Sequence, residues 1–153
     1  MKIVIATFNK GKFKEFKDLF SKSNFEILSL NDFTTEDIVE TGRSYEENAM
    51  LKAKKASEFS NLPSLGDDSG LEVKLLNSDP GLFSARYSGK NATDETNIKK
   101  LLKETKNLKN TRAKFVSTLA FYDPQKNLEL FSFGELEGEI IKEKKGDKGF
   151  GYD

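Results

Sequence analysis

The sequence has 153 residues, of which 36% are hydrophobic, and this length supports one compact domain with a core of ordinary size. It contains no cysteine and no histidine, which excludes disulfides, thiolate catalysis and histidine-ligated metals and leaves acid–base chemistry to Asp, Glu, Lys or Tyr. Twenty-five basic and twenty-five acidic residues cancel, so no global field attracts nucleic acid or an anionic membrane. No stretch resembles a signal peptide or a bilayer span, and we expect a cytoplasmic protein.

The N-terminal part of the chain predicts two strands with a helix between them. Residues 2–7 contain three consecutive β-branched residues, a pattern typical of a buried strand. After a turn, phenylalanine and leucine recur at helical spacing from Phe13 to Phe20. Residues 26–30 predict a short second strand, and the polar residues 31–42 predict a loop.

A second helix is expected to begin after Ser44. Ser44-Tyr45-Glu46-Glu47 has the form of a capping box, in which the serine accepts from the backbone N–H three residues on and Glu47 reaches back. Apolar residues then recur at spacings of three and four, and most of them are small, which permits close packing against a sheet. They are Tyr45, Ala49, Ala53, Ala56 and Phe59. Pro63 ends this pattern.

The second half of the chain predicts a third helix and a long hairpin. Thr93 is a suitable cap for the helix, whose inner face would carry Ile98, Leu101 and Leu102. Residues 113–122 and 128–137 are two β-like runs joined by a short segment with a proline, which favours an antiparallel hairpin. Helices interspersed with strands early and a hairpin late indicate an α/β fold with a mixed central β-sheet flanked by helices.

Gly66-Asp67-Asp68-Ser69-Gly70 is the most informative segment. We expect an acidic turn here, followed by a strand at Leu71-Glu72-Val73. The segment places two adjacent carboxylates and a hydroxyl at the mouth of this strand, between glycines that let another molecule approach the backbone. Carboxylate oxygens suit Mg²⁺, and either acid can take a proton from water. Because the two negative charges repel each other, a divalent cation is the simplest way to keep both ionised in a cleft. The alternative is an acidic surface turn, since the same residues are good turn formers.

A second candidate is the turn Thr7-Phe8-Asn9-Lys10-Gly11-Lys12. It lies where a strand leads into a helix, and free backbone N–H groups and the helix dipole favour a phosphate at such a position. Lys12 adds a full charge, and Thr7 and Asn9 add short-range donors. The segment lacks the spacing of a P-loop, and its alternative interpretation is a solvated turn with lysines.

Two further segments carry candidate site residues. Glu40, Glu46 and Glu47 are candidates for an additional metal ligand. Glu40 is preferred, because Glu47 is better explained as the cap partner of Ser44, and the alternative for Glu40 is a solvated position in an acidic loop. At the other end, Gly149-Phe150-Gly151-Tyr152-Asp153 offers two aromatic rings that can stack on a base, with Asp153 as a hydrogen-bond acceptor. A glycine-rich end that happens to hold aromatic residues is the alternative.

Seven motifs, taken in order, match the pattern of one protein family. They are Thr7-x-Asn9-x-x-Lys12-x-x-Glu15, Glu40-Thr41-Gly42, Glu47-Asn48-Ala49 with Lys52-Ala53, Asp67-Asp68-Ser69-Gly70-Leu71, Pro80-Gly81 with Ser84-Ala85-Arg86-Tyr87-Ser88-Gly89, Ala92-Thr93-Asp94, and Gly149-Phe150-Gly151-Tyr152-Asp153. The ordered set resembles the nucleoside triphosphate pyrophosphatases that clear inosine and xanthosine triphosphates, the ITPase or dITP/XTP pyrophosphatase family. The resemblance covers essentially the whole chain.

This resemblance implies a homodimer with an elongated α/β fold and Mg²⁺-dependent hydrolysis that yields a nucleoside monophosphate and pyrophosphate. By position, the segment from Thr7 to Lys12 would bind the triphosphate. Asp68 would act as the base and, with Glu40, as a metal ligand. Ser69 would contact the substrate, and Phe150, Gly151, Tyr152 and Asp153 would line the base pocket.

Two departures from the family pattern affect this expectation. Val39 stands where relatives often carry a second acid, and relatives normally continue past the Gly-Phe-Gly-Tyr-Asp segment with a substrate-binding lysine and a Ser-His-Arg segment. We therefore expect a single ITPase-like domain over residues 1–153, incomplete at its C-terminus, with weakened or absent activity by itself. The alternatives are a truncated nucleotide-binding remnant without turnover and a non-catalytic dimerising domain.

Overall fold

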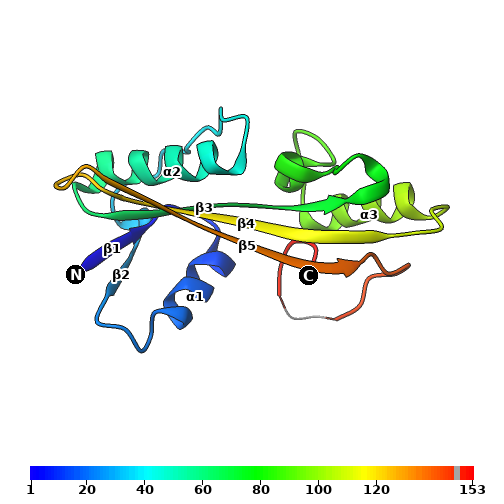
Figure 1. Cartoon of the computed structure of the whole chain (residues 1–153), viewed down its shortest axis with the longest axis horizontal. Helices are drawn as coiled ribbons and strands as arrows, with labels where there is room; N and C mark the ends of the chain where they lie inside the picture. The colour runs from blue at the N-terminus through cyan, green and yellow to red at the C-terminus, as the bar shows by residue number, and fades with distance from the viewer. Residues whose placement is uncertain (147–148) are drawn as a thin grey trace. The chain divides into compact units, whose positions relative to one another are not determined.

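A computed structural model describes residues 1–146 and 149–153 of the chain (Figure 1). The chain divides into two compact units: unit 1 comprises Met1–Asp68 and Thr118–Phe133, and unit 2 comprises Ser69–Ser117 and Gly134–Asp153. The strands are β1 (Lys2–Ile5), β2 (Glu26–Ser29), β3 (Ser64–Val73), β4 (Arg112–Asp123) and β5 (Leu128–Glu139), and the α-helices are α1 (Lys10–Leu19), α2 (Tyr45–Ser60) and α3 (Asp94–Thr105). Short 3₁₀ helices are η1 (Leu30–Asp32), η2 (Lys74–Leu76) and η3 (Gly81–Arg86).

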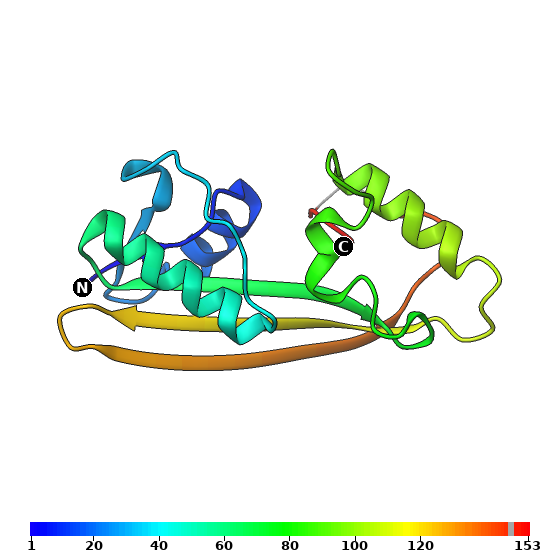
Figure 2. The same cartoon turned by 90° about the horizontal axis from the view of Figure 1, so that it is seen from above.

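The strands form a mixed sheet in the order β2-β1-β3-β4-β5, which confirms the predicted fold class. Strand β1 pairs in parallel with β2, from Lys2 opposite Glu26 onward, and with β3, where Val4 lies opposite Ser64. Strands β4 and β5 are neighbours joined by only four residues, so they form the expected antiparallel hairpin (Figure 2).

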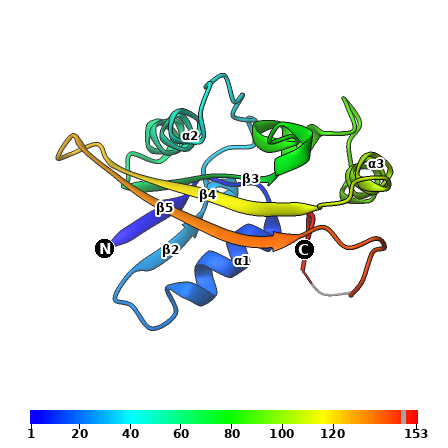
Figure 3. The same ribbon diagram turned by 45° about the vertical axis from the view of Figure 1, so that its right-hand side comes forward.

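In unit 1, helices α1 and α2 cover opposite faces of the sheet (Figures 1 and 3). Successive residues of a strand point to opposite faces, so β1 contributes to two cores. Ile3, Ile5 and Leu65 pack with the α1 phenylalanines. On the other face, Val4 packs with Ala56 of α2.

Helix α2 lies very close to β3 because its inner face is built from small residues. Ala49, Ala53 and Ala56 are completely buried. A Cβ atom added at Gly66 of β3 would lie 2.0 Å from the Ala49 carbonyl oxygen, so no larger residue fits there. Phe59, predicted to lie on this face, is exposed, whereas Ser57 is buried and donates to the Leu62 carbonyl at 2.6 Å.

In unit 2, helix α3 and η3 pack around Leu71, Val73, Tyr87 and Leu101. Buried Asn97 of α3 ties the two helices together. It accepts from the Ser88 N–H at 2.8 Å and donates to the carbonyls of Ser84 and Ala85. The predicted cap is confirmed, since the Thr93 hydroxyl accepts from the Thr96 N–H at 3.2 Å.

The acidic segment, residues 66–70, is not the turn that its composition predicts. Strand β3 runs without interruption from Ser64 to Val73, and Asp67 and Asp68 lie inside it with little exposure. Turn-forming residues are tolerated here because the glycine permits close helix packing and each acid has a lysine partner. Among the described residues, no helix is long and apolar enough to cross a membrane.

The close packing of α2 on β3 leads to a test. We expect Gly66→Ala to lower the free energy of unfolding by about 3 kcal/mol, because the added methyl group overlaps backbone atoms of Ala49 and Ala53. Urea denaturation measures the effect. The matched control is Gly134→Ala, whose new Cβ atom would meet nothing within 4 Å and should change stability by no more than about 0.5 kcal/mol. Equal effects of the two substitutions would contradict this account of the packing.

Candidate active site

Asp67 and Asp68 are consecutive residues of β3, so their side chains point to opposite faces of the strand. Asp67 pairs with the Lys12 ammonium of α1. Asp68 instead pairs with Lys52 of α2, at 3.4 Å from its Oδ1. The expectation that a single cation neutralises both acids is therefore wrong, because the strand separates the two carboxylates and each has its own lysine.

Asp68 lies in a polar cluster with Glu40, Asn48 and Lys52, which we call the Asp68 cluster. Asn48 donates its side-chain N–H to Asp68 Oδ2 at 3.0 Å, and Lys52 Nζ lies near Asp68 Oδ1. The same ammonium donates to Glu40 Oε1 at 2.7 Å. Asn48 and Lys52 are one helical turn apart, so α2 presents them together to one carboxylate.

The surroundings of Asp68 raise the pKa of its carboxyl group above the usual value. The largest cause is burial, which disfavours the charged form, and the charge of Glu40 acts in the same direction. The Lys52 charge and the hydrogen bonds from Asn48 and Lys52 oppose this shift. A carboxylate with a raised pKa is a better proton acceptor near neutral pH than an exposed one.

The candidate acids Glu40, Glu46 and Glu47 have different surroundings. Glu46 and Glu47 are exposed. The Ser44 hydroxyl accepts from the Glu47 N–H at 3.2 Å, as predicted, whereas the Glu47 carboxylate accepts from the N–H of Arg43, one residue before the cap, at 2.7 Å. Glu40 alone of these acids contacts Lys52.

The donor set of the Asp68 cluster fits a divalent metal. Lys52 already places a cation between two carboxylates, and carboxylate oxygens are the hard ligands that Mg²⁺ prefers. Within residues 1–146 and 149–153, no group of three or more His, Cys, Asp or Glu side chains could hold a metal ion. Mg²⁺ commonly binds through one or two carboxylates together with phosphate oxygens and water, so a site with two carboxylates can be sufficient for it.

The turn from Thr7 to Lys12 is held by its own side chains. Asn9 caps α1, and its Oδ1 accepts from the N–H groups of Gly11 at 2.8 Å and Lys12 at 3.1 Å. The Thr7 hydroxyl accepts from the Asn9 N–H. The expectation of free N–H groups is therefore wrong for Gly11 and Lys12. Phe8 packs against the core below the turn, and Lys10 is exposed.

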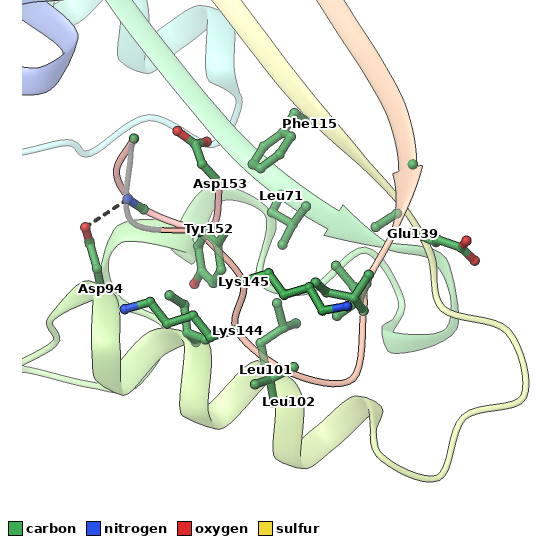
Figure 4. Close-up of a pocket in the computed structure, with 18 of the residues that line it drawn as sticks. Leu71, Asp94, Leu101, Leu102, Phe115, Glu139, Lys144, Lys145, Tyr152 and Asp153 are labelled. Carbon is green, nitrogen blue, oxygen red and sulfur yellow. Dashed lines mark hydrogen bonds between the residues drawn. The ribbon is translucent and has the colours of Figure 1, made fainter.

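In unit 2, the segment from Gly149 to Asp153 is anchored by specific contacts. The Gly151 N–H donates to Asp94 Oδ2 at 2.8 Å (Figure 4), and the Tyr152 hydroxyl donates to the Ser84 carbonyl at 2.8 Å. Asp153 Oδ2 accepts from the Phe150 N–H. Burial, and secondly the charge of Asp94, raise the pKa of Tyr152. Tyr152 is thus half-buried and packs against the core of unit 2, and it also lines the pocket beside this segment.

A pocket of about 450 Å³ lies beside this segment in unit 2. Its apolar wall includes Leu71, Leu101, Leu102, Phe115 and Tyr152 (Figure 4). Charged residues at its edge include Asp94, Glu139, Lys144, Lys145 and Asp153. Its volume and its mixture of an apolar wall with a few polar groups are those of a small-molecule site.

Comparison with known proteins identifies the family. Residues 3–153 match the model of the Ham1 family. This chain belongs to the Ham1 family. It is 46% identical over 156 residues to a dITP/XTP pyrophosphatase of Oceanobacillus iheyensis, a match that covers 99% of this chain and 79% of the relative. It is 47% identical over 155 residues to a dITP/XTP pyrophosphatase of Haemophilus influenzae, and this match covers 99% of this chain and 80% of the relative.

Solved structures of Ham1 proteins have the same fold. A HAM1 protein from Coxiella burnetii superposes with a TM-score of 0.89 at 39% identity, and the Staphylococcus aureus Ham1 protein with 0.85 at 41% identity. Both matches cover 100% of this Ham1 chain and 79% of the other.

Sequence reasoning assigned no role to Asn48 or Lys52, although both occur in a quoted motif. The available signal was their spacing. They are polar residues four apart, and each directly precedes an alanine of the buried face of α2, Ala49 or Ala53. A polar side chain beside a buried face needs a hydrogen-bond partner when it is buried. Ser69 directly follows Asp68 in β3 and is half-buried.

The raised pKa of Asp68 predicts how stability depends on pH in this Ham1 chain. With EDTA present, Asp68→Asn should raise the urea midpoint at pH 7.5, because the buried charge that folding disfavours is removed. The difference in urea midpoint between the variant and the wild type should disappear as the pH falls through the raised pKa toward the ordinary value of 3.8, because the wild-type carboxyl is then protonated and uncharged. A lower midpoint at pH 7.5, or a gain that does not depend on pH, would contradict the electrostatic account.

Proposed function

We propose that this chain is a nucleoside triphosphate pyrophosphatase that hydrolyses the deaminated purine nucleotides ITP, dITP and XTP to the monophosphate and pyrophosphate. The Asp68 cluster carries this proposal, because it holds a buried carboxylate with a raised pKa beside a lysine and a second carboxylate. Ham1 relatives named dITP/XTP pyrophosphatase, at 42–47% identity, support the same activity.

Asp68 is the general base of the proposed reaction. The reaction adds water across the anhydride bond between the α and β phosphates, and the base takes the proton of the attacking water. Asn48 donates an N–H to Asp68 Oδ2 at 3.0 Å and Lys52 Nζ lies 3.4 Å from Oδ1, so Oδ1 has the longer of the two contacts and accepts the proton through its second lone pair. Lys52 lies beside Oδ1 and places a positive charge next to the reacting phosphates.

Mg²⁺ is the proposed cofactor, with Glu40 and Asp68 as its ligands. When bound, it would neutralise phosphate charge and lower the pKa of coordinated water. The segment from Thr7 to Lys12 binds the triphosphate, with Lys10 as its exposed cation. Asn9 orders this segment through the cap of α1.

The residues of unit 2 are proposed to recognise the purine. Phe150 and Asp153 contact the base, Gly151 gives access to the backbone, and Tyr152 holds the segment through Ser84. The φ angle of Gly151 is +60°, in the left-handed region that favours glycine. Ser69 contacts the substrate. By resemblance to the family, the proposal also includes a homodimer, a cytoplasmic location and no nucleic-acid partner.

Pyrophosphate release from dITP tests the proposed function. With Mg²⁺ we expect pyrophosphate and dIMP, and no release with EDTA. Asp68→Asn should lower kcat by a factor of about 10² to 10⁴, the usual contribution of a general base, while nucleotide binding remains. The matched control is Lys55→Met, which removes an exposed lysine of α2 that pairs with Glu58 and should leave kcat unchanged.

Four results would contradict the proposal. Release of inorganic phosphate in place of pyrophosphate would show that a bond other than the one between the α and β phosphates is cleaved. Full activity of the Asp68→Asn variant would exclude Asp68 as the base. Binding of dITP without any turnover would indicate a nucleotide-binding remnant, and calorimetry that detects neither Mg²⁺ nor dITP binding would indicate a non-catalytic domain.

A further inference from the structure

We propose that Asn48 is a positioning residue that locks the Asp68 carboxylate and the loop carrying Glu40 to each other. Both ends of its side-chain amide are used. Its Oδ1 accepts from the Gly42 N–H at 2.8 Å, and its Nδ2 donates to Asp68 Oδ2 at 3.0 Å. A single side chain therefore joins two segments that carry the two carboxylates of the proposed site, and this inference rests on the proposed function for its catalytic consequence.

Chemistry permits only one orientation of this amide. The Gly42 N–H is a donor, so it requires the amide oxygen, and an ionised Asp68 carboxylate is an acceptor, so it requires the amide nitrogen. Asn48 is only 1% exposed, and water cannot replace either contact without rearrangement. The amide consequently fixes one rotational position of the Asp68 carboxylate.

The glycine at position 42 makes the connection possible. A Cβ atom added there would lie 2.5 Å from Asn48 Oδ1 and 2.8 Å from Glu47 Cβ, so only glycine lets the loop approach this closely. Glu40 lies two residues before Gly42 and contacts Lys52, which also contacts Asp68. The amide of Asn48 and the ammonium of Lys52 thus both connect this loop to Asp68.

Asn48 differs from an ordinary buried polar residue because it holds the reacting group. Removal of an outer partner of a ligating or reacting carboxylate typically costs about 10–100-fold in metal affinity or activity. Misplacement of a reacting group by about 1 Å has a similar effect on rate. Loss of Asn48 should therefore lower kcat, and loss of a buried polar residue elsewhere in α2 should lower only stability.

Two substitutions separate the two ends of the amide. In Asn48→Asp the side chain keeps its shape and an oxygen that can accept from the Gly42 N–H, but it brings an acceptor against Asp68 Oδ2. We expect kcat for dITP to fall about 10–100-fold with KM within about threefold, and protection of the Gly42 amide from hydrogen exchange to persist. In Asn48→Ala both contacts are lost, so kcat falls and the Gly42 protection is lost as well.

The matched control is Ser57→Ala. Ser57 is a buried polar residue of the same helix, 4% exposed, and its hydroxyl contacts Leu62 and Ser64 rather than the site. This variant should be less stable than the wild type, with kcat and Gly42 exchange unchanged. Stability of all variants is measured by urea denaturation, so that a loss of folding is separated from a loss of rate.

The proposal is overturned if folded Asn48→Asp retains wild-type kcat, or if Gly42 exchange is unchanged in Asn48→Ala. If Asn48→Ala does not fold, the isosteric Asp variant decides the question. If the wild-type chain releases no pyrophosphate, the proposed function fails. The connection of Gly42 and Asp68 through Asn48 is then tested by NMR alone. Both substitutions should then shift the ¹³C resonance of the Asp68 carboxyl group, and an unshifted resonance would exclude contact with Asn48.

Discussion

The alternation of side chains along β3 is the constraint on which unit 1 depends. Two acids in succession inside a buried strand must face opposite sides, and each then needs a cation on its own side. Helix α1 supplies Lys12 for Asp67, and helix α2 supplies Lys52 for Asp68. The two helices that cover the sheet therefore also neutralise its buried charges, and the two acids have different surroundings.

The contacts of Asp68 with α2 depend on how closely this helix packs against β3. Gly66 and Asp68 are two residues apart and face the same helix. Gly66 receives the backbone of Ala49 and Ala53, and each of these alanines directly follows one of the polar residues that contact Asp68. The small residues thus set the distance at which Asn48 and Lys52 contact the carboxylate, so one stretch of helix provides both the close packing and the partners of Asp68.

Much of the fold is predictable from local patterns, because periodicity and capping act over a few residues. The helices after Asn9, Ser44 and Thr93 and the hairpin of β4 and β5 all follow from such signals. The acidic segment does not, since glycine and aspartate favour turns locally and only packing against α2 and pairing with lysines make residues 66–70 a strand.

The sequence motifs name candidate site residues but not the contacts between them. The motifs named Asp68 and Glu40, and the structure joins both to Lys52. Asn9 caps helix α1 by accepting from the Gly11 N–H, and the Tyr152 hydroxyl donates to the Ser84 carbonyl. Sequence spacing does not reveal these hydrogen-bond partners. Asn48 was missed because its two partners, Gly42 and Asp68, belong to different segments of the chain.

Double-mutant cycles on unfolding free energy test the separation of the two acids most directly. The variants are Lys12→Met, Lys52→Met, Asp67→Asn and Asp68→Asn, combined in pairs. We predict coupling of about 1 kcal/mol or more for Lys12 with Asp67 and for Lys52 with Asp68, and coupling within about 0.5 kcal/mol of zero for the two crossed pairs. Strong coupling of Lys12 with Asp68, or of Lys52 with Asp67, would contradict the account.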